Sequence, residues 1–319
     1  HRDVHVLHHG GEDHAAALLD RHAAVGVDPD HLRVAAAGID RGGIVTATGS
    51  ITGFGSVHVN GVHYVTTGAT ITLDDNPGAE SDLRVGQVVR IEGRIGQDGV
   101  NGTATRVIFD DEVEGPVQSI DRVNSRLVVL GRTVQVSTQT SFDDSISPRS
   151  LEGVAVGERI EVSGLVATTG VVEATRIERK TAQASVEVKG TISALDTNAR
   201  TFALSQLTVS YASAQLNGFA SGQPANGDRV EAFGSVDGNG VLVATRVERE
   251  SGGTAGNADE QADYEGLITS FVSATDFAVA GQRVTTTTST AYEGGTASNL
   301  ALDVPVEVEG RFNASGVIV

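Results

Sequence analysis

Histidine is the residue type with the clearest chemical potential in this chain. Seven of its nine histidines fall within the first 31 residues, at His1, His5, His8, His9, His14, His22 and His31. His8, His9 and His14, together with two nearby carboxylates, offer the imidazole and oxygen ligands that Zn²⁺ and related metals accept. The segment lacks the His-Glu-x-x-His spacing that places two imidazoles on one helical face. Two interpretations follow: a metal site at His8, His9 and His14, or a polar histidine-rich tail.

Paired carboxylates are the second feature with chemical potential. Such pairs are Asp74-Asp75, Asp110-Asp111 and Asp143-Asp144. Two carboxyl groups can share the acid and base roles of glycoside hydrolysis, but all three pairs fall on predicted loops, where solvation accounts for them. The sequence contains no Gly-x-Ser-x-Gly motif and no glycine-rich loop ending in Lys-Ser or Lys-Thr. We therefore expect no catalytic residues, no enzymatic activity and no bound cofactor.

The charge balance limits the partners of the chain. Its 319 residues include 23 Lys+Arg and 41 Asp+Glu, which gives a net charge of −18. Nucleic-acid-binding proteins gain affinity by neutralising phosphates with basic side chains, so we expect no nucleic-acid partner. The absence of cysteine excludes disulfides and thiolate metal sites. No apolar run reaches the ~18 residues of a membrane-spanning helix, so we expect no membrane span.

A repeat organises the elements that must position these residues. The run Ala-Thr-Arg followed by Val or Ile occurs at residues 104–107, 174–177 and 244–247, in two steps of 70 residues. A strand-like segment that ends in glycine precedes each run and occurs a fourth time; the four copies are 88–93, 159–164, 229–234 and 306–310. The chain therefore contains four related units.

The repeat divides the chain into an arm and four β-domains. The predicted boundaries are 1–42 for the histidine-rich arm and 43–112, 113–181, 182–252 and 262–319 for the domains. The fourth domain ends before its last strand is complete. Residues 251–261 are rich in glycine and polar side chains, which predicts a flexible linker and a loosely attached fourth domain.

Each unit has the pattern of a small β-structure. Apolar and polar residues alternate, as in residues 159–163, which is typical of half-buried strands. Asn60-Gly61 between two such runs is a strong hairpin signal, and Gly131 and Gly281 occupy the matching positions of other units. The predicted fold is all-β: four tandem barrels of the oligonucleotide/oligosaccharide-binding (OB) type, each of about 70 residues. A small sandwich or another barrel topology is the alternative.

Three runs are distinctive enough to compare with known proteins. They are residues 38–43 (Gly-Ile-Asp-Arg-Gly-Gly), 49–57 (Gly-Ser-Ile-Thr-Gly-Phe-Gly-Ser-Val) and 156–164 (Val-Gly-Glu-Arg-Ile-Glu-Val-Ser-Gly). In these runs the chain resembles an uncharacterised family of exported bacterial proteins with tandem copies of a domain of unknown function. The resemblance extends over residues 38–319. It implies barrel-like domains in a secreted or surface protein and supplies no known activity or catalytic residues.

The end of the sequence suggests how copies could associate. Residues 316–319 align with 240–243, so the sequence stops just before the Ala-Thr-Arg run of the fourth unit. Either the sequence is a fragment, or a strand from a neighbouring copy completes this barrel. The alternating residues 3–7, with Val4 and Val6, are the predicted donor, and Val317 and Val319 lie on the predicted acceptor. Donation of this kind joins copies head to tail.

These observations favour a structural function. We expect a non-enzymatic, acidic, exported protein whose four domains form a rod, as a subunit of an extracellular filament or cell-surface assembly and a self-associating homopolymer. The alternative is a periplasmic or surface module that binds a carbohydrate, metal or protein partner. The chain has only 9 Phe and 4 Tyr, and single-strand binders usually present more stacking rings, which favours the structural interpretation.

Overall fold

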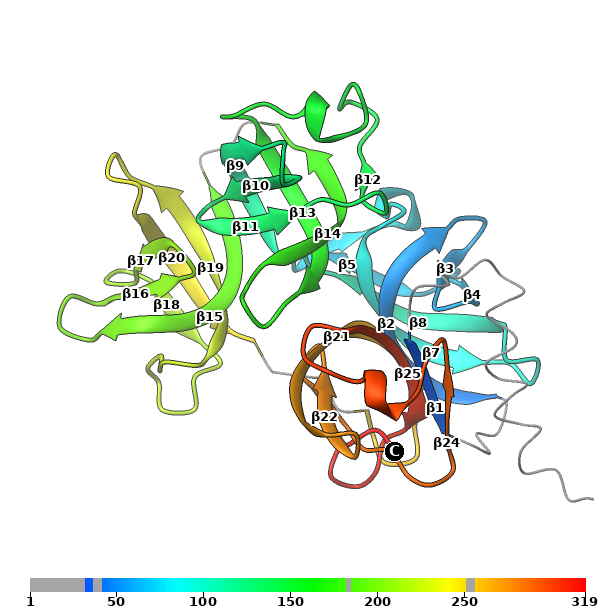
Figure 1. Ribbon diagram of the computed structural model, residues 1–319. Helices are drawn as coiled ribbons and strands as arrows, with labels where there is room; N and C mark the ends of the chain where they lie inside the picture. The colour runs from blue at the N-terminus through cyan, green and yellow to red at the C-terminus, as the bar shows by residue number, and fades with distance from the viewer. Residues whose placement is uncertain (1–31, 37–41, 182–184, 251–255) are drawn as a thin grey trace, which may run out of the picture.

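The computed structural model describes residues 32–36, 42–181, 185–250 and 256–319 (Figure 1). Within these ranges the chain forms strands β1–β25 and the short 3₁₀ turns η1–η3, with no α-helix. The predicted all-β class is therefore confirmed. The helical segments of the described ranges are all too short and too polar to cross a membrane.

Each of the first three units contains an opening strand, a hairpin, one or two short strands and a final hairpin. Unit 1 comprises β2 (Gly43–Gly53), β3 (Val57–Val59), β4 (Val62–Val65), β5 (Thr70–Leu73), β6 (Asn76–Gly78), η1 (Glu80–Asp82), β7 (Val88–Ile95) and β8 (Asn101–Phe109). Unit 2 comprises β9 (Val113–Asp121), β10 (Arg126–Val129), β11 (Arg132–Gln135), β12 (Ser141–Phe142), η2 (Leu151–Gly153), β13 (Arg159–Val166) and β14 (Val172–Arg179). Unit 3 comprises β15 (Val186–Asp196), β16 (Thr201–Leu204), β17 (Leu207–Ser210), β18 (Gln215–Asn217), β19 (Arg229–Val236) and β20 (Leu242–Arg249).

The fourth unit follows the same plan until its end. It comprises β21 (Gln261–Ser273), β22 (Asp276–Val279), β23 (Gln282–Val284), β24 (Thr290–Glu293), η3 (Ala297–Asn299) and β25 (Pro305–Arg311). Strand β1 (Leu32–Ala36), which precedes unit 1 in the sequence, also belongs to this unit, because it pairs with both β24 and β25.

Each of units 1 to 3 closes into a small barrel. In unit 2, β9 pairs with β10, β10 with β11, β11 with β14, β14 with β13, and β13 again with β9. The pairing of β11 with β14 is parallel and the other four are antiparallel. Units 1 and 3 repeat this order. This order confirms the predicted small barrel and excludes an open sandwich.

Tight hairpin turns set the register of the barrels. Asn60 and Gly61 have φ angles of 49° and 72°, as a type I′ turn requires. Gly131 and Gly281 also have positive φ angles, and each follows a residue in the same left-handed region. The Asn60-Gly61 hairpin and its predicted counterparts are thus confirmed, and they place alternate side chains in the barrel interiors.

The barrels have three hydrophobic cores between them. Unit 1 has its own core, which includes Tyr64, Ile91 and Val107. Units 2 and 3 share one continuous core, and unit 4 has another that takes in Leu32 and Val34 of β1. The sharing of a core means that units 2 and 3 are fixed against one another.

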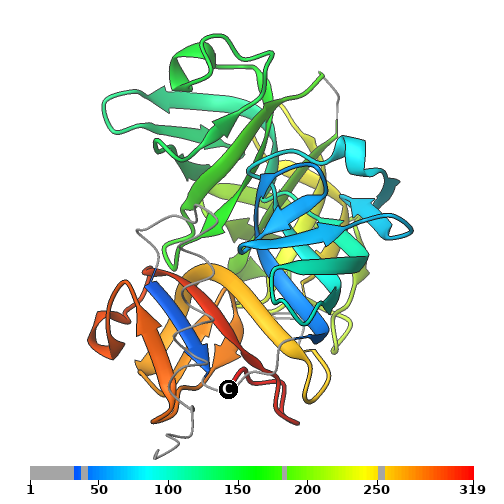
Figure 2. The same ribbon diagram turned by 90° about the vertical axis from the view of Figure 1, so that its right-hand side faces the viewer.

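The four units fold back into a compact body instead of the expected rod (Figures 1 and 2). Strand β2 of unit 1 pairs in parallel with β21 of unit 4, from Val45↔Gln261 to Thr48↔Tyr264. Strand β9 pairs with β15 to join units 2 and 3. Units 2 and 4 also touch, since Thr168 donates two hydrogen bonds of 2.6 and 2.7 Å to the Asp303 carboxylate. These contacts of unit 4 with units 1 and 2 also correct the expectation of a loosely attached fourth unit.

Candidate functional site

The fourth unit holds a strand from elsewhere in the chain. In unit 2, the last strand places Ile177 opposite Val162 of β13 and Phe142 of β12. In unit 4, Val34 of β1 lies opposite Val308 of β25 and Tyr292 of β24, which are the corresponding positions. Strand β1 therefore occupies the position in unit 4 that the last strand occupies in the other units, and the arm predicted at residues 1–42 must be corrected to exclude residues 32–36.

The direction of β1 is reversed relative to the strand that it replaces. Strand β14 runs antiparallel to β13 and parallel to β12. Strand β1 runs parallel to β25 and antiparallel to β24, and it is visible in Figure 1 as the dark blue strand beside β25. A strand can form backbone hydrogen bonds with its neighbours in either direction. The place beside β24 and β25 therefore requires apolar side chains but does not require one chain direction.

The side chains of β1 are held by burial and by one charged group. Leu32 and Val34 are 5% and 3% exposed and pack in the core of unit 4. Arg33 is also buried: its Nη1 donates to Glu293 Oε2 at 3.2 Å, and its Nε lies 3.4 Å from Glu307 Oε2. Burial, with Asp263 as the next contribution, raises the pKa of Glu307 well above its ordinary value, and Arg33 opposes that rise. Arg33 is thus the cation that supports a buried carboxylate in unit 4.

The residues predicted for assembly are placed only in part. Val4 and Val6 lie outside the described residues, as do the predicted metal ligands His8, His9 and His14. Val317 is buried and Val319 is 36% exposed. Arg311 and Val319 exchange two backbone hydrogen bonds, of 3.1 and 2.9 Å, so residues 317–319 pair with their own unit. Ile318 forms isolated β-bridges with Val284 and Phe312, and β1 lies further along β25.

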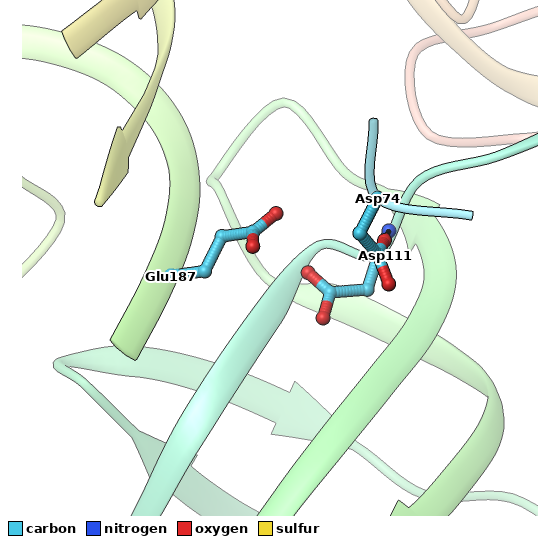
Figure 3. A group of neighbouring side chains, drawn as sticks. All are labelled: Asp74, Asp111 and Glu187. Atoms are coloured by element: carbon cyan, nitrogen blue, oxygen red, sulfur yellow. Dashed lines mark hydrogen bonds between the residues drawn. The ribbon is translucent and has the colours of Figure 1, made fainter. Parts of the chain in front are cut away.

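A second site lies where units 1, 2 and 3 meet. Asp74 follows β5, Asp111 lies in the connection from β8 to β9, and Glu187 is on β15. Carboxylate oxygens of the three residues lie within 4.8 Å of one another, with Glu187 extending toward the two aspartates (Figure 3). The backbone N–H of Asp111 donates to Asp74 Oδ1 at 3.0 Å. Asp111 is 0% exposed, which corrects the expectation that solvent accounts for this carboxylate.

The carboxylates around Asp111 differ in their partners. Asp111, Glu114 and Glu161 form a second group within 4.8 Å. Glu114 pairs with Arg159 and Glu161 pairs with Lys180. In the part of the chain that the structure describes, no ion pair joins Asp74, Asp111 or Glu187 to a basic side chain, and neither carboxylate oxygen of Asp111 has a hydrogen-bond partner.

Burial and mutual repulsion raise the pKa values of this cluster. Burial raises the pKa of Asp74 to about 6 and that of Glu161 to about 7. Burial and the neighbouring Glu231 raise the pKa of Glu187 to about 10. For Asp111, burial is the largest cause and Glu187 the next, and they raise its pKa well above the ordinary value. The cluster therefore favours a bound proton or a bound cation at neutral pH.

A cleft of about 790 Å³ opens between units 1, 2 and 4. Ser50, Gly86, Thr175, Leu267 and Asp303 are among its lining residues. None of its lining residues is aromatic, whereas proteins that bind bases on a β-surface usually stack them on aromatic rings. The cleft therefore gives little support to a base-stacking site.

The comparisons with known proteins match the repeat and no specific function. A family model described as Domain of unknown function (DUF5666) matches residues 42–108, 114–178, 189–248 and 265–319. No curated protein matches the chain. The family comparison thus matches the four repeated domains and identifies no functional residue.

Proposed function

The chain belongs to the DUF5666 family, and from its fourth unit we propose that it is a non-enzymatic structural protein whose copies associate by exchanging β1. In the associated form, β1 of one copy lies in the fourth unit of the next. We place this assembly outside the cell or on its surface, in keeping with the net charge of −18 and the resemblance to exported repeat proteins.

The observation that carries the proposal is the position of β1. Its contacts in unit 4 are all non-covalent, and they join residues that lie far apart in the chain: Arg33 and Glu293 are 260 positions apart. A second copy offers the same apolar position and the same two glutamates. Domain swapping exchanges an identical element between copies at low cost, and a swap that does not close on itself extends into a chain of subunits.

Cysteine pairing between different copies tests the exchange. Ala35 of β1 lies directly opposite Ala291 of β24. Such antiparallel pairs have Cα atoms about 4.5–5.5 Å apart, within the range that a disulfide spans. The chain has no cysteine of its own, so an introduced pair reports on one contact only. Chains carrying Ala35→Cys are co-expressed with chains carrying Ala291→Cys and oxidised gently.

Exchange of β1 predicts a covalent dimer of the two variants on a non-reducing gel, because neither variant contains both cysteines. The matched control replaces Ala291→Cys by Val272→Cys, an exposed position of the same unit that does not face β1. A dimer yield no higher than that of the control would show that β1 stays in its own chain. Electron microscopy of the same preparation shows whether exchanged copies form rings or filaments.

A further inference from the structure

We propose that Asp74, Asp111 and Glu187 bind one divalent cation of the oxygen-preferring class, with Ca²⁺ as the best fit, at the junction of units 1, 2 and 3. This site is separate from the β1 position and would stand whether or not β1 is exchanged.

The first argument is the unpaired carboxylate of Asp111. Both of its oxygens are buried and neither has a hydrogen-bond partner among the described residues. A buried carboxylate in that state costs far more free energy than one with partners. A proton would neutralise the charge, but the second oxygen of Asp111 would still need a donor. A metal ion satisfies both oxygens at once.

The second argument is the spacing of the oxygens. The three side chains offer ligand oxygens that all lie within 4.8 Å of one another. Bonds of about 2.3–2.6 Å from Ca²⁺ to oxygen place ligands on opposite sides of the ion about 5 Å apart. The separations of the three oxygens are therefore compatible with ligands that share one Ca²⁺ ion. Figure 3 shows Asp74 and Glu187 on different sides of Asp111, so the ligands approach from separate elements.

The third argument is the contrast with the other buried carboxylate cluster. Asp263, Glu307 and Glu309 of unit 4 also come within 4.8 Å of one another. There the guanidinium of Arg33 lies 3.4 Å from Glu307 and supplies the positive charge. The described part of the chain brings no such side chain into ion-pair contact with Asp111, so a cation from solution takes that role.

The ligand types select the metal. All three candidate ligands are carboxylates, which are hard oxygen donors, and the group contains no imidazole. Mg²⁺ keeps several of its water molecules, whereas Ca²⁺ accepts many protein oxygens in irregular geometry. The complete burial of Asp111 leaves little room for retained water and so favours Ca²⁺. Bound there, the ion ties together unit 1, the connection at Asp111 and unit 3.

Calorimetric titration of the full chain with CaCl₂ tests the site. The protein is first stripped of divalent ions with a chelator and is then titrated near pH 7.5. The expected result is binding of one Ca²⁺ per chain and a higher thermal unfolding temperature in the presence of Ca²⁺. Asp111→Asn and Glu187→Gln should each raise the Kd at least roughly tenfold, because even indirect partners of a metal ligand matter by that factor.

The two variants are expected to fold, since each removes one charge from a group of like charges; circular dichroism checks this. Asp144→Asn is the matched control, because Asp144 is an exposed aspartate that forms an ion pair with Arg149 of its own loop. No heat and no thermal shift with the wild-type chain would overturn the proposal. Equal loss of binding in Asp144→Asn and Asp111→Asn would also overturn it, because it would mean that Ca²⁺ responds only to overall charge.

Discussion

The negative charge of a carboxylate with no exposed surface, such as that of Asp111, must be neutralised by a proton or balanced by a cation. The same holds for the other buried acids of the junction, whose ordinary pKa values near 4 are raised by burial. Each raised pKa means that the folded chain binds protons more tightly than the unfolded chain does. The free energy of unfolding therefore depends on pH through these residues.

Without a divalent cation, stability should fall as the pH rises from about 5 to 8. Glu161 has an ordinary pKa of 4.5 and a folded pKa of about 7, and Asp74 changes from 3.8 to about 6. The stability that both groups contribute is fully present below their ordinary pKa values. It is lost as the pH rises through their folded pKa values. Lys180 and Glu178 face Glu161, and Lys189 and Asp110 face Asp74. The two lysines oppose the rise of these pKa values, and the two acids add to it.

Urea midpoints in the presence of a chelator measure this dependence. Burial lowers the pKa of His58, which acts in the opposite direction, so the informative quantity is the difference between the wild type and Glu161→Gln. The wild type should lose more stability than the variant between pH 5 and 8. Parallel pH profiles for the two proteins would contradict the assignment of Glu161 as a buried acid with a raised pKa.

Arg33→Ala should destabilise the chain by about 3 kcal/mol, because the change removes the buried positive charge that supports Glu307 and Glu293. The side chains of Arg33 and Glu307 are 8% and 4% exposed. The matched control is Arg283→Ala, whose pair with Asp276 is exposed and should be worth less than about 1 kcal/mol. Equal urea midpoints for the two variants would show that Arg33 does not support the β1 position.

At the scale of elements, the barrel strands pair as local patterns predict. Alternating apolar and polar residues indicated the strands, and Asn60-Gly61 indicated a hairpin. The pairing of β2 with β21 and the docking of β1 were not predicted. Both join segments that are distant in sequence, and no local signal encodes such a pairing. The side chains alternate between apolar and charged at Leu32, Arg33 and Val34. Three such residues beside a histidine-rich segment are too few to indicate a strand.

Removal of residues 1–36 should loosen unit 4 selectively. Strand β1 covers β24 and β25, whose backbone groups on that side would lose their partners. Hydrogen–deuterium exchange should therefore become faster in β24 and β25. The hairpin of β13 and β14 is complete without β1 and serves as the internal control. Uniform acceleration across the chain, or none, would contradict the replacement of the last strand by β1.

At the scale of the whole molecule, the junctions between units decide which residues are buried. The charged residues at the ends of units look solvated in the sequence, and those that meet another unit become buried, as Asp111 does. The repeat predicted each barrel but not the contacts between barrels, because the same repeat could form a rod or a compact body. The position of the carboxylate cluster was unpredictable for this reason.

Proteolysis between residues 251 and 261 should leave the molecule in one piece. The fourth unit pairs with β2 along Val45–Thr48 and holds β1 from the other fragment. A chain cut in this segment should therefore elute from a size-exclusion column at the volume of the intact chain and separate only in denaturant. Separate elution of a fragment containing unit 4 under native conditions would show that these contacts are too weak to hold it.

The distance in sequence between β1 and its unit also has a consequence for the time of synthesis. Arg33 and Glu293 are 260 residues apart. A ribosome that adds roughly 5–20 residues per second makes β1 some 13–50 s before it makes β24. During that interval β1 of the growing chain has no fourth unit of its own. If copies exchange β1 as proposed, a chain further ahead on the same messenger RNA completes its fourth unit first, and that unit can take up β1 before the chain's own fourth unit is made.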